Sequence, residues 1–464
     1  MSRQARRHGV IDSRRCVVTT ALGRAVAVLV MLAALGNWPA RAADQTTAGL
    51  AFRVGKVVAM DDQNTVVNDA VVLVKDGRIE AVGPTAKIAI PTSYRVLDFK
   101  DAWLVPGLVD AHDHAAAGTW SDLNDMVYLS NPGLDSRAGA RPDNEWIKRA
   151  RAGGVTTVML LPGSGTNISG FGTVVNTGGK SPDGIIIRSP GSLKIAQAGN
   201  PEWYFGGNGR MFMNWNTRQT LEKARAYAAK WAAYDDAAKR SVAAHDKASK
   251  GGGDEHATAP SSAPGRPEFD PIWDGFRGLF NGTYPATVHT QIYQVVLTTI
   301  DMIDGHFKLW TVLDHSCFDA WKLGPLVSAA ESAGDNIWTI CGPRGYHFDR
   351  NARRMVGFAA GWWKNGVRRV GINTDAPVIP QEELFYQAAM ACYFGWLPYD
   401  ALRGVTNIPA KAIGVYNQVG SVEPHKQADL TIWTGDPLDP RSACLMTVVD
   451  GKIVYDGTKS LRRF

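Results

Sequence analysis

Two histidines one residue apart, His112 and His114, follow an apolar segment that reads Leu104-Val-Pro-Gly-Leu-Val-Asp-Ala. Side chains at positions i and i+2 of a strand point to the same side, so both imidazoles would be directed at one point where a buried strand ends. Neutral imidazole is a common ligand for zinc and related divalent metals. A single His-x-His pair also occurs without a metal, so the interpretation depends on whether the rest of the chain supplies further ligands.

Apolar segments alternate with helix-like stretches in the middle of the chain, as is typical of a parallel α/β sheet. We expect eight strands, at residues 104–112, 155–161, 184–188, 192–196, 286–292, 309–314, 337–341 and 367–373. Eight strands favour a closed (β/α)₈ TIM-like barrel over an open doubly wound sheet. Residues 217–250 are rich in alanine and charge and are predicted to be helical, and residues 251–271 are predicted to be a flexible insert.

The two ends of this region have a different texture, with short β-strands and Asp-Gly turns. Asp76-Gly77 separates two apolar segments near the start, and Asp450-Gly451 does the same near the end. We therefore predict a small β-sandwich domain built from both termini. Its parts are residues 50–104 and 406–464, and they enclose a barrel domain of residues 105–405.

Polar residues recur where the predicted barrel strands end, which is where catalytic groups lie in a (β/α)₈ barrel. Besides the first two histidines, these ends carry Lys194, His289, Asp314, His315 and Asp375. Each alone could be a core histidine, a surface lysine or a carboxylate that caps a helix. Their joint placement at one edge of the predicted barrel favours a shared metal site.

These motifs resemble the amidohydrolase superfamily, and within it the secreted imidazolonepropionase-like and Xaa-Pro dipeptidase-like enzymes. The resemblance is carried by Pro106-Gly-Leu-Val-Asp-Ala-His-Asp-His114, Gly154-Val-Thr-Thr-Val158, Leu193-Lys-Ile-Ala196 with Gly199-Asn-Pro201, Leu313-Asp-His315, Thr374-Asp375, and the C-terminal segments 407–414, 420–424 and 428–441. It covers almost the whole chain after residue 42. The motifs are specific for the superfamily and carry little information about the substrate.

The resemblance implies a role for each of these residues. His112, His114 and Asp375 would hold one divalent metal, expected to be zinc, and His289 and His315 would hold a second. Lys194 would be carboxylated by CO₂, because a carbamate is an anion that can bridge two metals whereas an ammonium group repels them. Asp375 would act as general base and acid, taking a proton from a metal-activated bridging water and passing it to the leaving amine.

We therefore expect a metal-dependent hydrolase that cleaves an amide bond in a small molecule or dipeptide. Peptide-like substrates, N-acyl amino acids and cyclic amides all remain open. One alternative is a mononuclear metal-dependent deaminase of a nitrogen heterocycle, which Lys194 disfavours because such enzymes typically lack a carboxylated lysine. A non-catalytic binding protein on the same scaffold is a second alternative, and the complete set of ligand types disfavours it.

Other polar residues near the predicted site have open roles. Arg344 and His347 follow the seventh predicted strand and could either bind a substrate carboxylate or stabilise a loop. Strand alternation directs Asp113 and Asp314 away from the metals, unless they accept hydrogen bonds from histidine N–H groups. The segment Gly163-Ser-Gly165 lacks the spacing and the lysine of a nucleotide-binding loop.

Residues 1–42 have the features of a secretion signal. A basic head containing Arg14-Arg15 precedes an apolar run at 25–36, which is shorter than the roughly 20 residues that span a bilayer. Ala40-Arg-Ala42 offers a cleavage site, so we expect a periplasmic or secreted protein without a stable membrane span after cleavage. Ser13-Arg14-Arg15 also permits a twin-arginine signal.

Charge and cysteine content limit the remaining possibilities. The first 42 residues contain seven arginines and one aspartate, a net charge of +6, and the whole chain is also +6. The rest is close to neutral, so nothing indicates nucleic-acid binding. The four cysteines outside the leader lack a Cys-x-x-Cys pair, so disulfides are not indicated. A homo-oligomer is compatible with this sequence.

Overall fold

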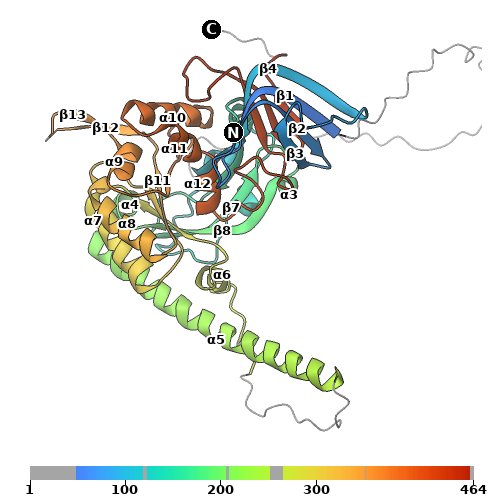
Figure 1. Cartoon of the computed structure of the whole chain (residues 1–464). Helices are drawn as coiled ribbons and strands as arrows, with labels where there is room; N and C mark the ends of the chain where they lie inside the picture. The colour runs from blue at the N-terminus through green and yellow to red at the C-terminus, as the bar shows by residue number, and fades with distance from the viewer. Residues whose placement is uncertain (1–48, 119–122, 205–207, 251–264, 351, 460–464) are drawn as a thin grey trace, which may run out of the picture. The chain divides into compact units, whose positions relative to one another are not determined.

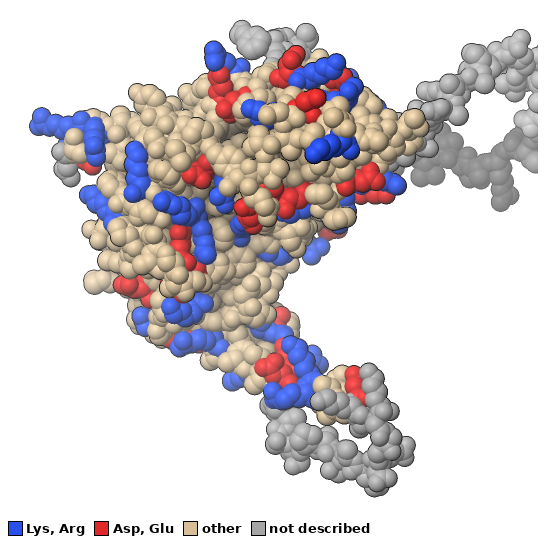
Figure 2. Space-filling view, in the orientation of Figure 1, with Lys and Arg blue, Asp and Glu red and all other residues tan. Residues whose placement is uncertain are grey.

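The computed structural model describes residues 49–118, 123–204, 208–250, 265–350 and 352–459 (Figure 1). Residues 48–464 form one compact unit, and the predicted signal peptide lies outside the described residues. No helix within the described ranges is long and apolar enough to cross a membrane. On the face drawn in Figure 2, basic and acidic side chains lie interspersed rather than in single-sign patches.

The larger of the two main sheets has eight strands in the order β14-β11-β10-β9-β8-β7-β6-β5. The bounds are β5 Leu108–Asp113, β6 Val155–Leu160, β7 Ile168–Asn176, β8 Ile186–Ala196, β9 Ala286–Thr290, β10 Thr311–His315, β11 Ile337–Cys341 and β14 Val370–Ile372. An isolated parallel bridge between Asp113 and Ala376 joins the two edges, so the sheet is nearly closed into a barrel. The predicted eight-stranded α/β barrel sheet is confirmed at this level.

The assignment of two strands was wrong. The predicted strands at 184–188 and 192–196 are the two halves of β8, and β7 was not predicted. Strand β7 runs antiparallel to both β6 and β8, so the barrel departs from a strict (β/α)₈ arrangement. Gly170 and Gly172 within β7 and Pro190 within β8 are residues that normally weaken or interrupt strands, which explains both errors.

Helices follow most of the barrel strands, and the long helix α5 extends away from the barrel (Figure 1). They are α2 Glu145–Ala152, α3 Pro182–Ile185, α4 Asn200–Tyr204, α5 Arg210–Lys250, α6 Gly275–Phe280, α7 Tyr293–Thr299, α8 Gly324–Ala333, α9 Phe358–Lys364, α10 Leu384–Tyr393, α11 Pro398–Arg403 and α12 Asn407–Ala412. Helix α2 begins where the Asn144 side chain accepts a hydrogen bond from the Ile147 N–H, and it buries Ile147 and Ala150. Helix α5 confirms the predicted helical stretch.

The second sheet draws its strands from both ends of the chain, in the order β17-β16-β15-β4-β1-β2-β3. These are β1 Gly49–Val58, β2 Val66–Lys75, β3 Arg78–Pro84, β4 Tyr94–Pro106, β15 Leu430–Trp433, β16 Cys444–Val449 and β17 Lys452–Asp456. Asp76-Gly77 and Asp450-Gly451 form the two predicted hairpin turns, with positive φ at all four residues. The strands form one sheet, and a two-layered sandwich is not confirmed.

A single residue, Gly107, separates β4 of this sheet from β5 of the barrel. Its N–H donates to the Asp429 carbonyl at 2.8 Å, and a Cβ there would lie 2.1 Å from the Thr156 hydroxyl oxygen. A side chain therefore does not fit at this crossing between the sheets. The fixed crossing sets the direction of β5, the strand that ends in the two histidines.

Candidate metal centre

The six predicted ligands come together at one end of the barrel. His112 lies on β5, His114 follows it, Lys194 lies on β8, His289 on β9, His315 on β10, and Asp375 follows β14. The five basic side chains are buried, with at most 5% of each residue exposed. Asp375 has 16% of its side chain exposed. The carboxylate of Asp375 is therefore the most solvent-accessible of these groups.

Three ligand atoms converge on the first predicted metal position. His112 Nε2 and His114 Nε2 lie 3.0 Å apart, and Asp375 Oδ1 lies 3.3 Å from the former and 3.2 Å from the latter. Ligands at 2.0–2.1 Å from a tetrahedral zinc ion lie about 3.3 Å from one another. The three donor atoms thus have the spacing that a divalent ion requires.

The second predicted position is bordered by His289, His315 and Lys194. The His289 and His315 rings have centroids 4.4 Å apart, and Lys194 Nζ lies 3.0 Å from His112 Nε2. Among the described residues, His289 Nε2 and both ring nitrogens of His315 are buried without a hydrogen-bond partner. Buried polar atoms are rarely left unsatisfied, so an ion that accepts one lone pair from each of the two rings fits this position.

The outer nitrogens of three histidines are held by other groups. His112 Nδ1 is hydrogen-bonded to Asp314 Oδ2, and His114 Nδ1 lies 2.9 Å from the Leu161 carbonyl oxygen. His289 Nδ1 lies 2.9 Å from the Ser164 hydroxyl. Such contacts fix the tautomer and the orientation of a metal-binding imidazole.

The two aspartates beside the histidines differ in role. Asp314 is hydrogen-bonded to the His112 ring, which agrees with the alternative that it accepts a hydrogen bond from a histidine N–H group. Its Oδ1 also accepts a hydrogen bond from Asn373 Nδ2 at 2.8 Å. Asp113 turns away and accepts backbone N–H groups of Ala115 and Ala116 at 3.0 and 2.8 Å. Asp314 therefore belongs to the support of the site, whereas Asp113 holds the turn after β5.

Burial shapes the protonation of the cluster. It lowers the pKa of His112 and His315 well below the usual range and that of His289 to about 3, and for His112 and His289 the charge of Lys194 is the next-largest cause. These imidazoles are therefore neutral at pH 7, which is the form that binds metals. Burial also raises the pKa of Asp375.

Two of the predicted ligands have a positive φ angle, which residues other than glycine rarely adopt. The φ angle is 63° at His315 and 51° at Asp375. Each such residue costs on the order of 1–3 kcal/mol, and residues of this kind cluster at functional sites. These backbone conformations are therefore imposed by the surrounding barrel and not by the local preference of the two residues.

The two predicted substrate-binding residues lie on the segment after β11. Arg344 is exposed, whereas His347 is partly buried and stacks on Phe358 with ring centroids 5.1 Å apart. Phe318 meets the His347 ring edge-on at 5.6 Å. The ring contacts of His347 are therefore with two phenylalanines rather than with the predicted ligands.

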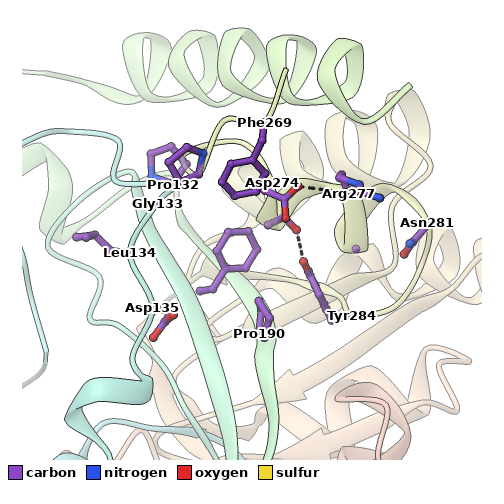
Figure 3. Close-up of a pocket in the computed structure, with 14 residues that line it drawn as sticks. Pro132, Gly133, Leu134, Asp135, Pro190, Phe269, Asp274, Arg277, Asn281 and Tyr284 are labelled. Carbon is purple, nitrogen blue, oxygen red and sulfur yellow. Dashed lines mark hydrogen bonds and ion pairs between the residues drawn. The ribbon is translucent and has the colours of Figure 1, made fainter. Parts of the chain in front are cut away.

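A separate pocket of about 480 Å³ lies between β7, β8 and α6 (Figure 3). Phe171, Phe269 and Tyr284 line it, and the described residues around it include none of the six ligands. Its one basic side chain, Arg277, is paired with Asp274 at 3.3 Å and with Asp235 at 2.8 Å. The pocket is thus distinct from the metal centre.

Sequence reasoning did not find the supporting roles of Leu161 and Ser164. They reach histidines 47 and 125 residues away in the chain. Ser164 is flanked by two glycines in a fully buried segment, and that unusual burial of a polar, glycine-rich loop becomes visible only in the fold.

Comparison with known proteins agrees with this geometry. The amidohydrolase family model matches residues 350–454, which include Asp375. The amidohydrolase tasK of Hapsidospora irregularis is 23% identical over 412 residues, 83% of this chain, and the chain spans 40% of that relative's length. An imidazolonepropionase of Pseudomonas putida is 38% identical over 58 residues, 12% of this chain and 14% of the relative.

A solved structure is similar to this chain over most of its length. The amidohydrolase of Thermotoga maritima is 27% identical, with a TM-score of 0.71, and the match covers 88% of this chain and 100% of that chain. The barrel, the ligand cluster, the family match and this structural likeness agree. The chain thus matches the amidohydrolase family model at residues 350–454 and is similar to amidohydrolases over most of its length.

Proposed function

We propose that the protein is a metal-dependent hydrolase that cleaves a carbon–nitrogen amide bond in a small molecule or dipeptide. The observation that carries the proposal is the convergence of His112 Nε2, His114 Nε2 and Asp375 Oδ1 at 3.0–3.3 Å. The match to the amidohydrolase family model supports a hydrolase, and the buried nitrogens of His289 and His315 support a second ion.

His112, His114 and Asp375 would hold one divalent ion and His289 and His315 the other, with zinc as the expected metal. Bound ions of this kind activate a water molecule and polarise a carbonyl oxygen. Lys194 lies within this cluster, 3.0 Å from His112 Nε2 and 3.9 Å from Asp314 Oδ2. Loss of one proton from the Lys194 ammonium group and addition of the resulting amine to CO₂, with loss of a second proton, would replace a buried cation by an anionic carbamate suited to holding metal ions.

Asp375 is the group placed to move the proton. It combines a raised pKa with the greatest exposure of the six, so it faces both the cluster and the entering substrate. Its carboxylate accepts the proton of the attacking water and then donates it to the leaving nitrogen. This exchange leaves Asp375 unchanged at the end of each turnover.

On the substrate side, Arg344 is the candidate for binding a carboxylate group. It is exposed on the segment after β11, and guanidinium pairs well with carboxylates. The stacking of His347 on Phe358 supports a loop-stabilising role for that residue instead. We further propose a periplasmic or secreted location, supported by the basic and apolar composition of residues 1–42.

The test is the metal content per chain of residues 43–464, measured by mass spectrometry for the wild type and for Lys194→Ala. Exposed Lys322 provides the control, as Lys322→Ala. The proposal is supported if the wild type holds two ions per chain and hydrolyses dipeptides or N-acyl amino acids. The metal content should fall sharply in Lys194→Ala and stay unchanged in Lys322→Ala. A content of one ion per chain that Lys194→Ala leaves unchanged favours a mononuclear deaminase. A wild type without bound metal favours the non-catalytic binding protein.

A further inference from the structure

The loop of residues 161–167, here called the β6 loop, contacts three strands that carry ligands, although β6 carries none. All seven of its residues are buried. The Leu161 carbonyl holds His114, the Ser164 hydroxyl holds His289, and Asn167 Nδ2 donates to the Ala196 carbonyl at 2.8 Å, two residues beyond Lys194. One short loop therefore contacts a predicted ligand at each of the two predicted metal positions.

The β6 loop is itself fixed by neighbouring backbone and side chains. The Gly163 N–H donates to the Leu123 carbonyl at 2.9 Å, and the Gly165 N–H donates to Asn124 Oδ1 at 2.8 Å. Ser164 lies between these two anchored glycines, with only 3% of its surface exposed. The backbone on both sides of Ser164 is thus anchored by hydrogen bonds, which restricts where its hydroxyl can lie.

A neutral imidazole has one nitrogen that donates a hydrogen bond and one that accepts. In His289, Nδ1 faces Ser164 at 2.9 Å, and Nε2 is the buried nitrogen without a partner among the described residues. If Nε2 carried the hydrogen, a donor would be buried unsatisfied and no lone pair would face the centre. A proton on Nδ1 that is donated to Ser164 removes this conflict, and it leaves the Nε2 lone pair available.

We propose that Ser164 is a positioning residue that fixes His289 as the Nδ1–H tautomer and so directs its Nε2 lone pair at the second metal ion. The proposal rests on the metal-dependent function proposed above. It adds that a residue outside the ligand set controls the occupancy of one ion and leaves the other nearly unchanged. The reason is that the Ser164 hydroxyl contacts His289, which borders the second predicted metal position.

The substitution that tests this role is Ser164→Ala, because it removes the hydroxyl and little else. Ser136→Ala is the matched control. Ser136 is equally buried, at 3% exposure, and its hydroxyl donates to the Leu160 carbonyl at 2.9 Å beside the same loop. Both variants lose one buried hydroxyl hydrogen bond, but only the first loses a contact to a histidine.

The first measurement is made on the metal-free protein, by nitrogen-15 NMR of the histidine rings. We expect the Nδ1–H form of His289 in the wild type and in Ser136→Ala, and a shift towards the Nε2–H form in Ser164→Ala. An unchanged tautomer in Ser164→Ala would overturn the proposal. Since no ion is present, this result is independent of whether the protein is a metal-dependent hydrolase.

The second measurement is zinc binding by competition with a chelator. We expect Ser164→Ala to weaken the binding of one of the two ions about ten- to hundredfold and that of the other less than about twofold. Ser136→Ala should bind both ions as the wild type does. Equal weakening of both ions, unchanged binding, or the same effect in Ser136→Ala would overturn the proposal. A wild type that binds no zinc would instead contradict the proposed function, and the NMR result would still decide the role of Ser164.

Discussion

His114 and Asp375 meet across the seam of the barrel, with His114 Nε2 3.2 Å from Asp375 Oδ1. The first residue follows β5 and the second follows β14, the two edge strands of the barrel sheet. The backbone joins at the same place, because the His114 N–H donates to the Ala376 carbonyl at 2.9 Å. A metal held by both side chains would therefore also tie together the two edges of the sheet.

Metal removal should destabilise the protein as well as inactivate it. A ligand that binds only the folded state at about a thousandfold excess over its Kd contributes about 4 kcal/mol. We expect the calorimetric Tm to fall by several degrees after treatment with a chelator and to recover when zinc is restored. A Tm that stays constant while mass spectrometry records loss of the ions would contradict the link between the seam and the site.

Substitution of Asp375 by Asn should remove the proton carrier. General acid–base catalysis contributes typically 10²–10⁴-fold, so we expect kcat to fall within that range. Metal content is measured in parallel, because Asp375 is also a predicted ligand. Asp319→Asn, at a side chain that is 45% exposed, is the control. Full hydrolysis by Asp375→Asn would rule out the proposed role.

Asp314 and Asp113 form a matched pair, since each is buried beside a histidine. Asp314→Asn should lower metal affinity about 10–100-fold, because the contact with His112 Nδ1 loses its charge. Asp113 instead accepts hydrogen bonds from the backbone N–H groups of Ala115 and Ala116, so its role is to hold the turn after β5. Asp113→Asn should therefore keep metal affinity within about twofold. Equal losses in the two variants would refute the distinction.

The metal-free protein should lose stability as the pH falls. His289 titrates near 6.5 when unfolded and near 3 when folded, so between these values the unfolded chain binds a proton that the folded chain does not. The free energy of unfolding then decreases with falling pH, by about 2 kcal/mol for this one group between pH 7 and pH 5. Urea titrations at both pH values, with His289→Gln for comparison, measure the contribution. A pH dependence unchanged in His289→Gln would contradict it.

Substitutions of Arg344 and His347 should have different effects on KM and on Tm. Arg344→Ala is expected to raise KM for substrates with a free carboxylate and to change KM little for the corresponding amides, because one ion pair is lost. His347→Ala is expected to lower Tm instead, since it removes the ring stacked on Phe358. Kinetics and thermal melts of both variants provide the check. A KM for carboxylate substrates that is unaffected by Arg344→Ala would exclude that residue as the binding group.

Much of the barrel could be predicted because its signals are local. Apolar runs located β9, β10 and β11, and Asp-Gly pairs located two hairpin turns of the other sheet. The run predicted as one strand at 104–112 instead spans the end of β4 and most of β5, which lie in different sheets. Strand β7 was missed because Gly170 and Gly172 remove the local strand signal. Its pairing with β6 and β8 stabilises it, and pairing between strands is not visible in a single segment.

The sequence by itself determined which residue types end the strands, and the i, i+2 spacing of His112 and His114 brings their Nε2 atoms 3.0 Å apart. Only the tertiary structure decided which groups hold these ligands. Asp314 reaches His112 across 202 residues and Ser164 reaches His289 across 125. The physical reason is that a strand's alternation fixes where its own side chains point, whereas contacts between strands depend on how the barrel closes.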